Sequence, residues 1–534
     1  MTDTAVVAPP GDASLPLDPR GSLSPEVARR LAALVAAAPG RPRRASNAPF
    51  DGSVLGEVPI CTAEDVAAAA AQARRAQEEW QQVPLAERGA IFLRFHDLLL
   101  DHQERLLDIV QLETGKARID AFAELVDAAL TARHYAHSAA RHLRSRRRQG
   151  VLPVVTRTVE HARPKGLVGV ISPWNYPLTL ATSDAAPALL AGNAILLKPA
   201  TETPLTALAA VDLLYEAGLP RDLFRVVCGS GSELGRPLVD AVDYVMFTGS
   251  TATGRVLAEQ CGRRLIGFSG ELGGKNPLIV LPDADPQTAA EGAVRACFSN
   301  SGQLCISIER IFVVDELYDR FVAAFLDRVR ALRLSRALEW EADMGSLITR
   351  EQVETVQSHV DDAVARGARL LAGGKARTDV GPLFFEPTVL EGVKEGMALA
   401  REETFGPVVA LYRARDTAEA IARANDSDYG LNASVWGSAS AARPVAAALR
   451  AGTVNINDGY GAAWASHDAP MGGMKASGLG RRHGAEGILK YTEAQTVAEQ
   501  RLVPLAPAGG MSQQQFARIW VGASRVLKRL PFLE

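Results

Sequence analysis

The sequence predicts an α/β protein with a doubly wound domain, a second α/β domain and a small β-hairpin arm. After residue 165, short apolar runs alternate with helical segments, the pattern typical of a parallel, doubly wound sheet. The same alternation begins again after Glu271. Two further segments, 156–162 and 489–498, alternate like exposed strands, and we expect them to pair away from both domains.

The chain before the first strand is expected to form a tail followed by helices. Residues 1–22 are rich in Pro, Gly, Ala and Asp and lack periodicity, which predicts a mobile tail. From 62 to 145 apolar residues recur at helical spacing, and Thr62 with Asp65 forms a capping box at the start. The expected boundaries are 1–48 for an N-terminal tail and helix, 49–145 with 165–270 for the first domain, 271–477 for the second, 146–164 with 478–500 for the arm, and 501–534 for a C-terminal tail.

The strands and helices of the two domains follow from short apolar runs and from helical periodicity. A Pro at the first helical position and a Gly beyond the end mark the helix after residue 203. Strands are expected at 167–172, 194–198, 224–228, 244–248, 278–281, 310–314, 406–412, 433–436 and 453–457, and helices at 286–300 and 317–332.

Composition excludes several classes of protein. With 58 Lys+Arg against 61 Asp+Glu, a net charge of −3 and 47% hydrophobic residues, the 534-residue chain is neither disordered nor a basic nucleic-acid binder. Five cysteines without a C-x-x-C pair argue against a disulfide scaffold and a zinc site, so we expect no metal and a reducing, cytoplasmic location. No apolar run approaches the ~18 residues of a membrane span.

Polar residues follow two strands of the first domain. Asn175 comes just after strand 167–172, and Lys198 ends the next strand. Ligands of open α/β sheets bind beyond the carboxyl ends of strands, so an amide and an ammonium are well placed there. Gly249 and Ser250 lead from a strand into a helix, whose exposed N–H groups suit a pyrophosphate, although the G-x-G-x-x-G spacing is absent.

Three more residues are candidates for chemistry. Cys305 follows small and polar residues and a Gly, which let the backbone turn closely around a nucleophilic sulfur. Glu271 lies between apolar segments, where desolvation would raise its pKa toward that of a general base. Glu403 could accept hydrogen bonds from sugar hydroxyls. Taken singly, each residue also has a non-catalytic interpretation. The cysteine could be a core residue, and the two glutamates could be solvated surface carboxylates.

In this order and spacing, the segments resemble the aldehyde dehydrogenase superfamily over about residues 50 to 500. Three segments, 168–177, 297–310 and 471–474, resemble more closely the actinobacterial NADP-dependent succinate-semialdehyde dehydrogenases of the second type. The resemblance implies that Cys305 attacks an aldehyde, that Asn175 stabilises the oxyanion and that Glu271 activates water to release a free acid. Separately, the two-stranded arm expected from 156–162 and 489–498 would not persist alone in water, so we expect a homodimer or homotetramer.

The resemblance further implies which residues contact the cofactor. They are Trp174, Asn175, Lys198, Thr201, Gly249, Ser250, Leu272 and Glu403. NAD-preferring relatives carry a glutamate at the position of Thr201, where it repels a 2′-phosphate, so its absence predicts NADP. NAD remains an alternative because Glu202, next in the chain, could restore part of that repulsion.

The sequence departs from its relatives at positions that affect the predicted substrate and the proton transfer. Similar succinate-semialdehyde dehydrogenases hold the distal carboxylate with two arginines, and those positions here hold Ser183 and Ser299. Asp184 stands where many relatives carry a Lys that assists proton transfer. Ser466 and His467 could bind a carboxylate instead, but the nearby Tyr460 and Trp464 suit an apolar or aromatic aldehyde equally well. The alternative is therefore a medium-chain or aromatic aldehyde.

Other classes of function stay open at this point. A non-catalytic binding protein on the same fold is one, since fold alone does not give function. Five arginines between 141 and 148 could contact nucleic acid, but they more often complement a helix dipole. From 516 to 530 an apolar stripe runs opposite basic residues, and we expect this helix to dock on the protein's own surface or a partner subunit rather than a membrane.

Overall fold

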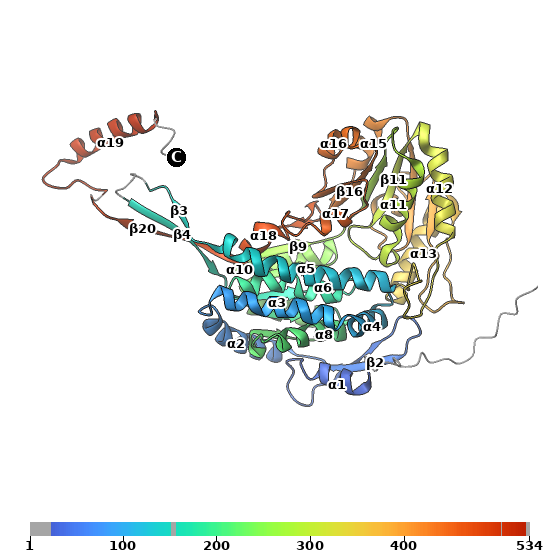
Figure 1. Ribbon diagram of the computed structural model, residues 1–534, viewed down its shortest axis with the longest axis horizontal. Coiled ribbons are helices and arrows are strands. Elements are labelled where there is room, and N and C mark those ends of the chain that lie inside the picture. The colour runs from blue at the N-terminus through green and yellow to red at the C-terminus, as the bar shows by residue number, and fades with distance from the viewer. Residues whose placement is uncertain (1–22, 151–155, 503–504, 530–534) are drawn as a thin grey trace, which may run out of the picture.

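The computed structural model describes residues 23–150, 156–502 and 505–529. It contains two large sheets, each with helices packed on it, and an arm that projects from the body (Figure 1). The tail expected over residues 1–22 lies outside the described residues. The mixed α/β architecture with parallel sheets confirms the predicted fold class.

The first sheet is doubly wound. Its order is β19-β9-β8-β5-β6-β7, and all pairs are parallel except β19 with β9. The chain starts at the central β5, moves outward on one side and then returns to the other, so a switch point lies between β5 and β8. The strands are β5 (Leu167–Ile171), β6 (Ala194–Lys198), β7 (Phe224–Val226), β8 (Tyr244–Thr248), β9 (Gly267–Glu271) and β19 (Gly478–Leu479).

Helices cover this sheet, and every residue of β6 and β8 is buried, as expected for parallel strands with both faces covered. Asp65 accepts a hydrogen bond from the N–H of Thr62 at the start of α2. The helices are α1 (Pro25–Ala32), α2 (Ala63–Trp80), α3 (Leu85–Asp101), α4 (Gln103–Thr114), α5 (Arg118–Leu143), α6 (Pro177–Thr182), α7 (Ala185–Leu190), α8 (Pro204–Glu216), α9 (Gly231–Ala241), α10 (Thr251–Arg264) and α18 (Gly484–Leu489). A hairpin of β1 (Arg43–Asn47) and β2 (Val54–Pro59) lies beside α1.

The second sheet has the order β12-β13-β14-β11-β10-β16-β17 and is parallel apart from β12. Alternate residues of β10 enter different cores: Leu278 and Val280 pack on one face, and Ile279 on the other. Its strands are β10 (Asn276–Val280), β11 (Ile308–Val314), β12 (Arg369–Ala372), β13 (Thr388–Glu391), β14 (Val408–Ala414), β16 (Asn432–Trp436) and β17 (Thr453–Ile456). The accompanying elements are α11 (Pro286–Phe298), α12 (Tyr318–Arg330), α13 (Arg350–Ala365), α14 (Ala398–Arg401), α15 (Thr417–Asn425), α16 (Ala439–Ala448), α17 (Gly461–Trp464) and the small pair β15 (Tyr429–Gly430) and β18 (Met474–Lys475).

The arm contains the predicted pair of distant strands. β4 (Thr156–Pro164) runs antiparallel to β20 (Thr492–Gln500) in unbroken register. A third strand, β3 (Arg146–Arg148), adds to the other edge of β4, which places three of the basic residues in a sheet rather than at a helix end. The strand expected from residue 489 begins later, because Leu489 is the last residue of α18.

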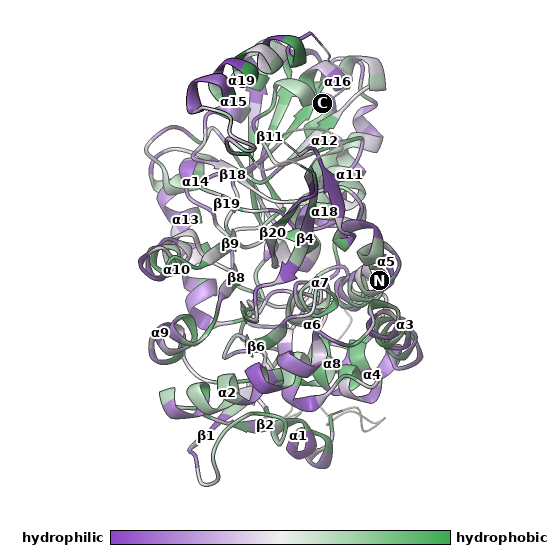
Figure 2. Cartoon of the chain, turned by 90° about the vertical axis from the view of Figure 1, so that its left-hand side faces the viewer, coloured by the Kyte–Doolittle hydropathy of each residue, from purple (hydrophilic) through white to green (hydrophobic). Residues whose placement is uncertain are grey.

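The C-terminal helix α19 (Gln513–Leu527) forms as predicted, but its expected docking on the chain's own body is wrong for a single chain. The helix lies beside the arm, away from the sheets (Figure 1), and none of its residues is buried. Hydrophobic and hydrophilic residues both line its surface (Figure 2), and Ile519 and Val526 are 57% and 59% exposed. Among the described residues, no helix is long and apolar enough to cross a membrane.

Candidate active site

The segment before Cys305 has an unusual backbone. Asn300 and Ser301 are both left-handed, with φ of 51° and 53°, in the short helical turn Ser299–Gly302. Such conformations are costly for residues other than glycine and gather at functional sites. Gly302 is also left-handed, and a Cβ there would lie 2.1 Å from the carbonyl oxygen of Gly406. The segment is therefore held in one shape, with Cys305 at its end.

Hydrogen bonds of Asn175 connect the first domain to this segment. Its side-chain Nδ2 donates to the carbonyl oxygen of Gln303 at 3.0 Å, and its backbone carbonyl oxygen accepts from Nζ of Lys116 at 2.6 Å. Lys116 is fully buried and pairs with Glu124 at 2.7 Å. An amide nitrogen carries two hydrogens, so one N–H of Asn175 remains for a developing negative charge.

Glu271 ends β9 in a buried position. Burial raises the pKa of its carboxyl to about 7, although nearby Arg482 and Lys490 oppose the shift. Asp184 does not replace the expected Lys as a proton-transfer group, because its carboxylate pairs with Arg482 at 2.9 and 2.7 Å. Arg482 thus supplies positive charge near Glu271 from a different element of the fold.

One cavity of about 250 Å³ brings most of the predicted residues together. It lies where β5 and β8 end, the switch point of the first sheet, and faces the Cys305 segment of the second domain. Burial raises the pKa of the Cys305 thiol to about 12, and the carboxyls of Glu403 and Glu271 add to that shift. Of the residues singled out from the sequence, the cavity is lined by Trp174, Asn175, Gly249, Ser250, Glu271, Leu272, Cys305 and Glu403.

Glu403 lies opposite a glycine turn. Its carboxylate accepts the N–H of Gly274 at 2.8 Å, and burial raises its pKa to about 8. A Cβ on Gly273 would lie 2.4 Å from Oε2 of Glu403, and one on Gly249 would lie 2.5 Å from the ring of Phe247. A side chain at either position would therefore displace Glu403 or Phe247.

Lys198 and Thr201 are the two predicted residues that do not line this cavity. Lys198 stands beside Ile171 in the sheet, close to the turn that carries Trp174 and Asn175. Its buried ammonium donates to the carbonyl oxygen of Pro199 at 3.2 Å, and burial lowers its pKa. The hydroxyl of Thr201 donates to the carboxylate of Glu202 at 2.9 Å.

The sequence did not predict five residues of the cavity wall: Pro173, Thr248, Gly273, Gln352 and Phe405. Gln352, from α13, donates its side-chain amide to the carbonyl oxygens of Thr404 and Phe405 at 3.0 and 2.9 Å. The ring of Phe405 meets that of Trp174 edge-on, with centroids 5.4 Å apart. No sequence motif indicated that Gln352 lies at the site, because only the packing of α13 brings it there.

The expected carboxylate-binding role of Ser466 and His467 is not supported. Both ring nitrogens of His467 already have partners, the carboxylate of Asp127 at 3.2 Å and the carbonyl oxygen of Ala465 at 3.0 Å. The Ser466 hydroxyl donates to the carbonyl oxygen of Ala462. Ser183 lies within hydrogen-bond distance of the Thr179 hydroxyl, at 2.6 Å, so it offers no charge for a carboxylate either.

Comparison with known proteins identifies the family. Residues 37–497 match the model of the aldehyde dehydrogenase family. The chain belongs to this family. A relative from Mycolicibacterium smegmatis, named a putative NADP(+) succinate-semialdehyde dehydrogenase, is 57% identical over 483 residues, which cover 90% of this chain and 93% of the relative. The NADP(+) succinate-semialdehyde dehydrogenase of Escherichia coli is 38% identical, covering 83% of this chain and 92% of that protein.

Solved structures agree with this aldehyde dehydrogenase assignment. An NADP-dependent enzyme of Escherichia coli superposes with a TM-score of 0.84 at 36% identity and covers 88% of this chain and 97% of its own. A betaine aldehyde dehydrogenase of Staphylococcus aureus, solved in complex with NAD+, gives 0.85 at 32% identity, with coverage of 91% and 99%.

The site also fits a nicotinamide cofactor on its own chemistry. The buried ammonium of Lys198 has three N–H donors. Its one acceptor in the described part of the chain is the carbonyl oxygen of Pro199, which leaves two N–H groups for ribose or phosphate oxygens. The N-terminus of α10, with Ser250 as its cap, offers free backbone N–H groups to a pyrophosphate. The cavity of about 250 Å³ that Gly249, Gly273 and Cys305 line gives space for a nicotinamide ring.

Proposed function

We propose that this aldehyde dehydrogenase oxidises an aldehyde to the free carboxylic acid with NADP, and that succinate semialdehyde is a substrate. The observation that carries the proposal is the single cavity shared by Cys305, Glu271 and Asn175. The names of the relatives support both the substrate and NADP. Cytoplasmic location is part of the proposal, because a reactive thiol at Cys305 requires reducing conditions.

The first step forms a bond between Cys305 and the substrate. The thiol has a pKa of about 12, so it must lose its proton to a base as its sulfur attacks the aldehyde carbon. The free N–H of Asn175 and the backbone N–H of Cys305 stabilise the negative charge that develops on the oxygen. A nicotinamide held in this cavity would supply the acceptor for the hydride that leaves the carbon attached to sulfur.

The second step hydrolyses the resulting thioester. Glu271 takes a proton from water, the hydroxide attacks the acyl carbon, and the thiol of Cys305 leaves as the acid forms. A carboxyl with a pKa of about 7 exists in both protonation states near neutral pH, as a general base must. Arg482, ion-paired with Asp184, lies near enough to Glu271 to favour its ionised form.

The test of the function is kcat/KM for a panel of aldehydes with NADP and NAD in parallel. The panel contains succinate semialdehyde, unbranched alkanals and aromatic aldehydes. Formation of reduced cofactor with succinate semialdehyde, faster with NADP than with NAD, is expected. No reduction of either cofactor with any aldehyde would refute the proposed activity.

A second candidate is an aldehyde dehydrogenase for medium-chain or aromatic aldehydes. Tyr460 and Trp464 pack in the same apolar cluster as Cys305, and they line a larger cavity of about 520 Å³. Ser183 and Ser299 stand at the two positions where a pair of arginines is expected to bind the distal carboxylate of succinate semialdehyde. The same panel separates the two candidates, since the second predicts higher kcat/KM for the uncharged aldehydes.

Replacing Thr201 by glutamate is expected to shift preference toward NAD. A carboxylate at this position accepts hydrogen bonds from ribose hydroxyls and repels a 2′-phosphate. A like-charge contact of this kind should lower the NADP/NAD ratio of kcat/KM about fivefold to tenfold. The companion variant Glu202→Gln is the control. If Thr201→Glu leaves the ratio unchanged while Glu202→Gln raises it, Glu202 controls the selection.

We also propose a homodimer or homotetramer. The arm projects from the body, and its strand β20 is exposed along almost its whole length. Such a small sheet is marginal alone in water and needs a partner surface. The apolar residues of α19 would gain a partner in the same assembly. Light scattering at micromolar concentration is expected to give a multiple of the chain mass, and a monomeric mass would contradict this.

A further inference from the structure

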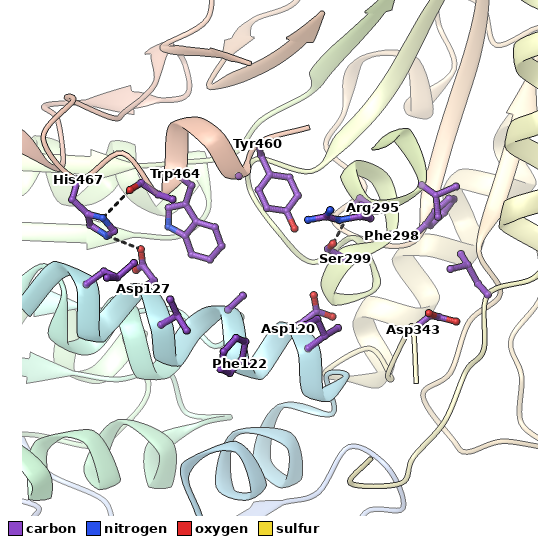
Figure 3. Close-up of a pocket in the computed structure, with 18 residues that line it drawn as sticks. Asp120, Phe122, Asp127, Arg295, Phe298, Ser299, Asp343, Tyr460, Trp464 and His467 are labelled. Carbon is purple, nitrogen blue, oxygen red and sulfur yellow. Dashed lines mark hydrogen bonds and ion pairs between the residues drawn. The ribbon is translucent and has the colours of Figure 1, made fainter. Parts of the chain in front are cut away.

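The large cavity is much bigger than a four-carbon semialdehyde requires. Its volume is about 520 Å³, and most of its wall is apolar, including Phe122, Phe298 and Trp464 (Figure 3). Trp464 meets the ring of Tyr176 edge-on at 5.5 Å, and both pack in the cluster that contains Cys305. The cavity therefore shares Tyr460 and Trp464 with the cluster on which Cys305 packs, and its apolar wall suits a longer hydrocarbon chain.

Arg295 is the cation that lines this cavity without a carboxylate partner among the described residues. Figure 3 shows its guanidinium pointing toward the hydroxyl of Tyr460. All three carboxylates of the cavity already have donors. Asp127 accepts from the hydroxyl of Thr179, Asp343 accepts the N–H of Arg333 at 2.8 Å, and Asp120 accepts the N–H of Asn300. The guanidinium is thus free to bind an incoming anion.

Arg295 lies close in the chain to Ser299, one of the two positions where similar enzymes carry a carboxylate-binding arginine. It lies four residues before Ser299, and the hydroxyl of Ser299 donates to the carbonyl oxygen of Arg295 at 2.8 Å. Ser299 follows the last residue of α11, and both Ser299 and Arg295 line the same cavity. Arg295 lies about one turn of α11 before Ser299, the position of the expected arginine, and so farther along the chain from Cys305.

We propose that this cavity binds ω-oxo carboxylates through Arg295, and that the best substrates have more than four carbons. The proposal rests on the aldehyde-oxidising function above and specifies its substrate class. A carboxylate held one turn farther from Cys305 needs extra methylene groups to place the aldehyde at the sulfur. Those groups lie against the apolar wall, where their burial adds to the binding free energy. Succinate semialdehyde is then a substrate, but a poorer one.

Asp120 sets the charge on the opposite wall. Its buried carboxylate accepts the N–H of Asn300 at 2.8 Å, and burial raises its pKa to about 6. It lies below Tyr460 in Figure 3 and would repel a substrate carboxylate that was not held by Arg295. Asp120→Asn removes this charge while keeping an oxygen acceptor for Asn300, so it provides an independent variant of opposite expected sign.

The experiment compares ω-oxo acids of four to eight carbons with unbranched alkanals of equal length, at saturating NADP. The ratio of kcat/KM for acid over alkanal is expected to peak above four carbons. Arg295→Gln should lower that ratio about fivefold or more through KM, a modest figure because Arg295 is exposed to solvent. Arg295→Lys should restore part of the ratio, and Asp120→Asn should raise it.

The matched control is Arg330→Gln, an exposed arginine of α12 that pairs with Asp327 outside the cavity, and it should leave every ratio unchanged. An equal loss for acids and alkanals in Arg295→Gln would show a structural role and overturn the proposal. A ratio that falls steadily from four carbons would overturn the chain-length part. Activity on alkanals with no acid preference would overturn the proposal while leaving aldehyde oxidation intact.

Discussion

Cys305→Ala is expected to abolish aldehyde oxidation, with a loss in kcat of at least about a thousandfold. Without the sulfur no covalent adduct forms, and no other described thiol lines the cavity with Glu271 and Asn175. The variant should still bind NADP, because the groups that fit the cofactor lie on the first sheet and on the turn at Glu403. Steady-state release of reduced cofactor and fluorescence titration with NADP measure the two properties.

The matched control is Cys297→Ala, eight residues earlier in the chain. Cys297 is buried among the apolar residues of α11, so its loss leaves a small void and lowers thermal stability without touching the cavity. Activity per folded molecule should stay near that of the unmodified protein. Oxidation that persists in Cys305→Ala, or disappears equally in Cys297→Ala, would refute the assignment of Cys305 as nucleophile.

Local pattern was enough to predict most of the fold. The strand at 194–198 was placed to the residue, because a continuous apolar run between turn signals leaves little choice of register. The pairing of β4 with β20 was also predicted, since both alternate in the same way and neither fits a buried sheet. The third strand β3 was missed because three consecutive arginines carry no strand signal.

Ion pairs between residues far apart in the chain could not be predicted from the sequence. Asp184 and Arg482 are far apart in the chain, and their hydrogen bonds depend on how α7 and the segment before α18 meet. The same holds for Gln352 and for the free guanidinium of Arg295, which no motif marked. Docking of α19 on the body of its own chain was wrong, and docking on a partner subunit stays a prediction. An amphipathic stripe indicates that a surface will be covered, but not by which molecule.

Glu271→Gln is expected to separate the two halves of the reaction. Attack by Cys305 and reduction of the cofactor precede the step that needs an activated water, so one burst of reduced cofactor per active site should remain. Steady-state turnover should fall about a hundredfold to ten-thousandfold, the usual contribution of a general base. Stopped-flow absorbance of the reduced cofactor records the burst and the slow phase together. A missing burst would show that Glu271 acts before hydride transfer.

The pH dependence provides a second readout of the same residue. Because burial raises the pKa of Glu271 to about 7, the carboxyl keeps its proton below that pH and becomes a base only above it. Where hydrolysis limits turnover, kcat should therefore rise between about pH 6 and pH 8, and Glu271→Gln should remove the rise. Glu402→Gln, an exposed neighbour of the cavity-lining Glu403, should keep both the burst and the rise. A pH profile unchanged by Glu271→Gln would assign the titration to another group of the site.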